Sequence, residues 1–72
     1  MNIENTLNQG INILKANNIP NPHLDSEIIL SESISKDKKY IILNSKEILD
    51  IKQIDNFKSF IERRKKVSQL LI

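Results

Sequence analysis

The sequence contains no cysteine and only one histidine, His23, among its 72 residues. Without cysteine the chain can form neither disulfides nor thiolate metal sites, so nothing covalent supports its core. Zinc sites use several histidine or cysteine ligands, and a single histidine does not supply them. We therefore expect no structural metal, and we interpret His23 as a surface residue in the first turn of a helix.

Long apolar runs are also missing. No stretch approaches the roughly 20 apolar residues that span a bilayer. The N-terminus, MNIENTLNQG, lacks the basic region and following apolar region of a signal peptide. These absences predict a cytoplasmic protein with no membrane partner, folded as a single small domain whose core buries only about 60% of the unfolded surface.

Apolar residues recur with helical spacing through the first half of the chain. Ile3, Leu7, Ile11 and Leu14 form one stripe, with Asn2 as N-cap and an end near Asn17-Asn18. Gly10 lies inside this helix, where we expect it to let another helix approach closely. A second helix should begin with Asn21 as cap and Pro22 in its first position. Its apolar residues cover most sides, which predicts a place in the middle of a bundle: Leu24, Ile28, Ile29, Leu30 and Ile34.

The sequence of the second half of the chain predicts a short helix, one further helical turn and a longer last helix. Asp37 can cap the helix KKYIIL, with Tyr40, Ile41 and Leu43 facing inward and the Tyr40 hydroxyl at the edge. Ser45 could cap one more turn, KEIL, and Asp50 with Gln53 resembles a capping box for the last helix. That helix would bury Ile51, Ile54, Phe57, Phe60 and Ile61. The predicted fold is all-α, a bundle of four or five short helices.

Two carboxylates, Asp25 and Glu27, lie at the start of the second helix. Their side chains diverge by about 200° on a helix, so they do not flank one substrate atom as an acid and base pair must. Asp25 suits the positive end of the helix dipole. Glu27, next to apolar positions, needs a cationic partner. Arg63 and Arg64 are the candidates, so we interpret these four residues as a structural clamp.

The net charge of +2 is unevenly distributed. Residues 57–72 contain five basic residues and one acid, Glu62, whereas the rest of the chain is slightly acidic. Arg63, Arg64, Lys65 and Lys66 are the candidate partner-binding residues. Consecutive basic residues point in all directions on a helix and aromatic residues are scarce, so nucleic-acid binding is a minor alternative. The interpretation that we prefer for this run is a solvated helix end that complements the helix dipole, with one arginine turned inward.

The stretch NIPNPHLDSEIILSESISKDKKYIILN resembles the N-terminal domain of the PrmC/HemK glutamine methyltransferases. That family has a Pro-x-Leu-Asp-x-Glu-hydrophobic run, then Lys-Asp, a short aromatic-led helix and a final Arg-Arg pair. The matching positions here are Pro22, Leu24, Asp25, Glu27, Ile28 to Leu30, Lys36-Asp37, Tyr40 and Glu62-Arg63-Arg64. The resemblance covers nearly the whole chain.

The resemblance implies a function in translation termination. Family members transfer a methyl group from S-adenosylmethionine to the glutamine of a Gly-Gly-Gln motif in class I peptide-chain release factors, and the N-terminal domain helps to hold that substrate. The sequence departs from the family after Lys66, where it reads VSQLLI. The family's Rossmann-like domain, glycine-rich loop and Asn-Pro-Pro-Tyr motif are absent. The resemblance thus implies a recognition domain that holds no cofactor or catalytic residue, with residues 67–72 beginning a linker to a catalytic domain.

One further alternative is a stand-alone helical module for protein interaction or dimerisation. Leu70, Leu71 and Ile72 would be exposed in the simplest bundle and could drive self-association.

Overall fold

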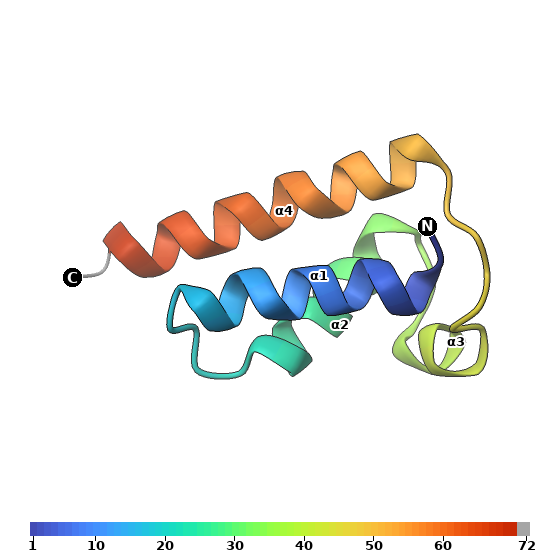
Figure 1. Ribbon diagram of the computed structural model, residues 1–72, viewed down its shortest axis with the longest axis horizontal. Helices are drawn as coiled ribbons and strands as arrows, with labels where there is room; N and C mark the ends of the chain where they lie inside the picture. The colour runs from blue at the N-terminus through green and yellow to red at the C-terminus, as the bar shows by residue number, and fades with distance from the viewer. Residues whose placement is uncertain (71–72) are drawn as a thin grey trace.

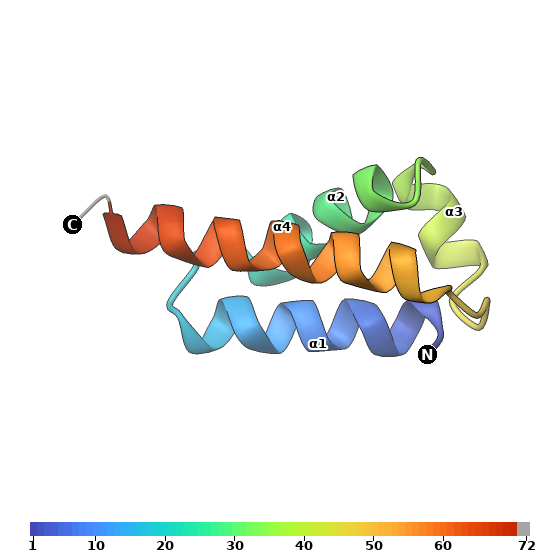
Figure 2. The same ribbon diagram turned by 90° about the horizontal axis from the view of Figure 1, so that it is seen from above.

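The computed structural model describes the backbone of residues 1–70 and the side chains of residues 1–66. Four helices follow one another: α1 (Ile3–Ala16), α2 (Pro22–Ser33), α3 (Lys38–Leu43) and α4 (Ile51–Leu70). The all-α prediction is confirmed, with four helices within the described residues. Helices α1 and α4 run in the same direction, α2 runs against them, and α3 closes one end (Figures 1 and 2).

Local capping chemistry sets the helix starts as predicted. The Asn2 side chain accepts a hydrogen bond from the Asn5 amide, and the Asp37 side chain accepts one from the Tyr40 amide, each at 2.8 Å. Asp50 and Gln53 form the reciprocal capping box, at 2.8 and 3.0 Å. Asn21 occupies the cap position of α2 but makes no side-chain capping bond. Pro22, which follows it, has no amide N–H to satisfy.

The first turn of α1 is also held by the loop before α4. The amides of Ile3 and Glu4 donate to the carbonyls of Glu47 and Ser45, both at 2.9 Å. Ile48 forms an isolated antiparallel bridge with Asn2. The helical turn expected at KEIL is therefore wrong, because this segment runs extended beside the N-terminus and supplies carbonyls to α1.

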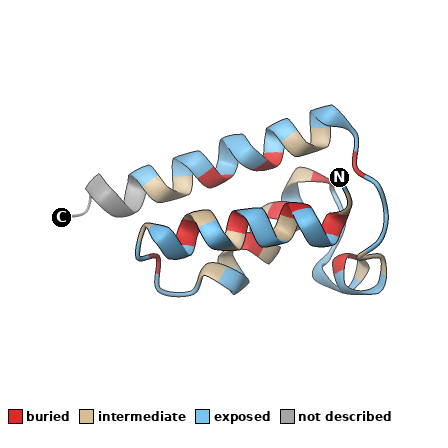
Figure 3. Cartoon of the chain, viewed as in Figure 1, coloured by how far each residue is buried: buried red, intermediate tan, exposed pale blue. Residues whose placement is uncertain are grey.

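The core lies between α1, α2 and α4, whose inner faces carry the buried residues (Figure 3). Gly10 is buried where α1 meets Phe57 and Ile61 of α4, which confirms the close approach predicted for it. The buried apolar residues come from every helix and from all three connections: Ile3, Leu14, Ile19, Leu30, Ile34, Ile41, Leu49, Phe57 and Ile61.

Several apolar residues that the periodicity placed in the core are exposed. Leu43 and Ile51 are solvent-exposed, and Phe60 is partly so. Leu24 and Ile28 are exposed as well, so α2 contributes a buried face but is not surrounded. The reason is geometric. Consecutive apolar residues are 100° apart on a helix, and a three-layer bundle of this size covers only one side of each helix.

Candidate functional site

The first two turns of α2 carry the motif Pro22, Leu24, Asp25 and Glu27, and one ion pair joins this motif to α4. Arg64 donates from both Nε and Nη2 to Oδ2 of Asp25, each at 3.1 Å. The Asp25 side chain is 22% exposed and that of Arg64 is 42% exposed. This contact spans 39 residues of sequence and fixes the later part of α4 against the start of α2.

The other two members of the expected clamp have different partners. Glu27 lies 3.6 Å from Nε2 of His23, one turn earlier on α2. The guanidinium of Arg63 lies 5.6 Å from the centre of the Phe60 ring. The arginine expected as partner of Glu27 therefore pairs with Asp25 instead. Of the two carboxylates, Asp25 pairs with a residue of α4 and Glu27 lies next to a residue of α2 itself.

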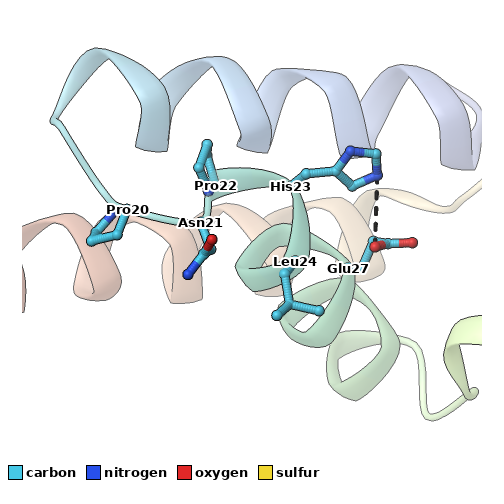
Figure 4. Close-up of a pocket in the computed structure, with 6 residues that line it drawn as sticks. All are labelled: Pro20, Asn21, Pro22, His23, Leu24 and Glu27. Carbon is cyan, nitrogen blue, oxygen red and sulfur yellow. Dashed lines mark ion pairs between the residues drawn. The ribbon is translucent and has the colours of Figure 1, made fainter.

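A shallow pocket of about 380 Å³ lies beside this motif, at the turn between α1 and α2. Figure 4 shows the imidazole of His23 and the carboxylate of Glu27 pointing toward one another at its edge. Its lining is Pro20, Asn21, Pro22, His23, Leu24 and Glu27. The pocket thus combines two proline rings and a half-exposed leucine with two titratable side chains. The expectation that His23 is a surface residue is confirmed.

The four basic residues near the end of α4 are not equivalent. Arg64 is engaged with Asp25 and Arg63 with Phe60. Lys65 pairs with Glu62 at 3.0 Å, and Lys66 is exposed. These residues do not form one stripe of free cations. Their role in binding a partner stays a prediction.

Tyr40 is half-buried and its hydroxyl donates to Oε1 of Glu47. This hydrogen bond, with burial and the negative charge of Glu47, raises the pKa of Tyr40 above its usual value of 10.0. Nζ of Lys36 lies 5.1 Å from the centre of the Tyr40 ring. The hydrogen bond to Glu47 thus ties α3 to the loop that follows it.

Two other findings bear on the chemistry of the described residues. They contain no group of three or more His, Cys, Asp or Glu side chains that could hold a metal ion. They also contain no helix long and apolar enough to cross a membrane. The proposed self-association through Leu70, Leu71 and Ile72 falls outside the residues whose side chains are described.

The ion pair between Asp25 and Arg64 gives a prediction for stability. Alanine at both positions, measured with each single variant by urea unfolding, should give a coupling energy of about 0.5–1 kcal/mol. The value is modest because water screens a pair in which Arg64 is two-fifths exposed. The same cycle on Glu62 and Lys65 is the matched control, and a pair of this spacing on one helix should give about 0.2–0.5 kcal/mol. Zero coupling between Asp25 and Arg64 would contradict the clamp.

Comparison with known proteins supplies a family. A family model described as the PrmC N-terminal domain matches residues 5–67. A comparison with curated proteins found no match, and neither did a comparison with solved structures. The matched range covers most of the chain, including α2 with its motif, α3, and α4 past Arg64. The chain therefore belongs to the PrmC N-terminal domain family.

Proposed function

We propose that this chain is the substrate-recognition domain of an S-adenosylmethionine-dependent protein-(glutamine-N5) methyltransferase that acts on class I peptide-chain release factors in the cytoplasm. The observation that carries the proposal is the family match over residues 5–67. The function we assign is binding of the release factor, while methyl transfer belongs to a catalytic domain joined to this one.

The residues of this chain do not fit the cofactor itself. S-adenosylmethionine sites in this family use a glycine-rich loop, and the single glycine here, Gly10, is buried inside α1 against Phe57. No step of methyl transfer is therefore assigned to these residues. What they supply is a packed bundle that offers side chains to a folded partner.

The contact between Asp25 and Arg64 supports the assignment of binding to this chain and of methyl transfer to a separate catalytic domain. It holds the later turns of α4 against α2, at the end of the molecule opposite α3 (Figure 1). A catalytic domain that follows α4 would then leave the bundle in a fixed direction. Binding energy gained by the recognition domain could in that way position the glutamine loop of the release factor.

Nuclear magnetic resonance tests the proposal directly. The ¹⁵N-labelled chain is titrated with an unlabelled class I release factor, and a short RNA at matched salt serves as the control. We expect amide shifts over one contiguous face with the release factor and none with the RNA. Absence of shifts at the highest soluble concentration, or equal shifts with RNA, would overturn the proposed function.

A further inference from the structure

The motif at the start of α2 contains two side chains that do little for the fold of the free chain. Asp25 pairs with Arg64, and Pro22 fills the first helical position, where its missing N–H costs nothing. Leu24, by contrast, is 44% exposed, and no described residue donates a hydrogen bond to the carboxylate of Glu27. Leu24 and Glu27 both line the pocket at the turn between α1 and α2. Motif residues without a full role in packing that meet at one pocket indicate a binding site.

The side chain of Glu27 is largely buried and has no cationic partner. It is 17% exposed, and its contact with Nε2 of His23, at 3.6 Å, is longer than a hydrogen bond. Within the described residues no lysine or arginine nitrogen lies within 4 Å of its carboxylate. His23 is 70% exposed, and an imidazole is mostly uncharged at neutral pH. Because a carboxylate withdrawn from water costs stability until a donor or cation reaches it, this position favours a positively charged ligand.

The pocket beside Glu27 has the chemistry of a site for a long basic side chain. The two prolines and Leu24 supply apolar surface for a run of methylene groups, within a volume of about 380 Å³. Figure 4 shows the carboxylate of Glu27 at the edge of this apolar lining. At neutral pH that carboxylate is the principal charge among the residues that line the pocket. A guanidinium or ammonium group on an aliphatic stem matches both parts of the lining.

The other charged side chains at this end of the bundle do not neutralise the pocket. Asp25 and Arg64 neutralise one another, as Glu62 and Lys65 do. The remaining cations are exposed, and none of those described lies within 4 Å of the pocket carboxylate: Lys15, Arg63 and Lys66. Water and salt screen such exposed charges. The nearly buried carboxylate therefore keeps its need for a direct partner.

We propose that the pocket at the turn between α1 and α2 receives an arginine or lysine side chain of a protein partner. Its charged group would bind the carboxylate of Glu27, and its methylene groups would lie against Leu24 and the proline rings. This inference rests on the proposed function, because it assigns that basic side chain to the release factor. Hydrogen bonds between ions of opposite charge are stronger than neutral ones, so this contact would be a principal one in the interface.

Other occupants match the pocket less well. A carboxylate of a partner, or a phosphate of a nucleic acid, would be placed beside the like charge of Glu27. A purely apolar side chain would remove the carboxylate further from water and supply no hydrogen bond in return.

Two substitutions with matched controls on α2 test the inference. Binding of a class I release factor is measured by calorimetry for Glu27→Gln and Leu24→Ala, with Glu32→Gln and Ile28→Ala as controls at exposed positions of the same helix. Circular dichroism checks that each variant folds. We expect Glu27→Gln to weaken binding at least about tenfold and Leu24→Ala severalfold, because they remove the charge and part of the apolar wall. The controls should change binding by less than about twofold.

Urea unfolding at pH 7 separates a role in binding from a role in the fold. Because Glu27 has no cationic partner in the free chain, Glu27→Gln should leave the urea midpoint unchanged or raise it. A clearly lowered midpoint would show that the fold itself needs the carboxylate, and would overturn the inference.

The binding outcomes separate the inference from the proposed function. If the unaltered chain binds and Glu27→Gln binds equally well, or loses no more affinity than Glu32→Gln, the inference fails and the proposed function stands. If the unaltered chain does not bind at all, the proposed function fails and the inference with it. Tighter binding by Glu27→Lys would identify an acidic occupant and overturn the proposed one.

Discussion

Replacement of Phe57 by alanine should lower the free energy of unfolding by about 3–5 kcal/mol. The ring is 1% exposed and lies where α4 crosses Gly10 of α1, so its removal leaves a cavity between two helices that small neighbours cannot fill. A domain of this length has a total stability of about 5 kcal/mol. We therefore expect a Phe57→Ala chain that is largely unfolded at physiological temperature, measured by circular dichroism during urea and thermal unfolding.

The same substitution one turn away on α4 provides the control. Phe60 is 39% exposed and the guanidinium of Arg63 lies near its ring. Phe60→Ala should cost less than about 1 kcal/mol, the value of an exposed ring and cation contact. Equal losses for the two variants would mean that α4 does not bury Phe57 against α1 as described.

Replacement of Gly10 by valine should cost about 2–3 kcal/mol. A Cβ added at this position would lie 2.9 Å from Cε2 of Phe57 and 3.2 Å from Cδ1 of Ile61, with Cζ of Phe57 nearer still. Two further methyl groups on that carbon would push α1 and α4 apart, and overpacking of this kind typically costs about 1–3 kcal/mol. Valine gains only a few tenths of a kcal/mol over glycine in helix propensity, so packing decides the sign.

Two comparisons identify the cause of that loss. Asn8→Val, on the exposed side of α1, should change stability by less than about 0.5 kcal/mol. Gly10→Ala combined with Phe57→Leu should be more stable than the sum of the single effects, by about 1 kcal/mol, because the smaller side chain leaves room for the new methyl group. Additive effects in that pair would show that Gly10 and Phe57 do not compete for the same space.

The features that the sequence predicted well depend on neighbouring residues in the chain. The helix caps are the clearest case. Each capping hydrogen bond joins residues only three positions apart, so the local sequence determines it: Asn2 with Asn5, Asp37 with Tyr40, and Asp50 with Gln53. The close approach of another helix at Gly10 could also be predicted. Glycine weakens a helix, so a glycine in a helix interior indicates that a larger side chain would not fit there.

The features that the sequence predicted poorly depend on contacts between distant segments. Which arginine meets Asp25 depends on how α4 is rotated against α2, and the spacing along either helix does not contain that angle. The sequence from Ser45 to Leu49 predicts a helical turn. In the structure its backbone carbonyls and amides instead form hydrogen bonds with the backbone of residues 1–4. The periodicity likewise counted Leu43 and Ile51 as core residues.

The bonds between the start of α1 and the loop before α4 have a consequence for amide hydrogen exchange. The first amides of a helix have no partner within it and ordinarily exchange with solvent at once. Here the protons of Ile3 and Glu4 are held by carbonyls more than 40 positions later in the chain. Slow exchange at these two sites would therefore report the docking of the loop, and would be lost on its release even while α1 kept its helical form.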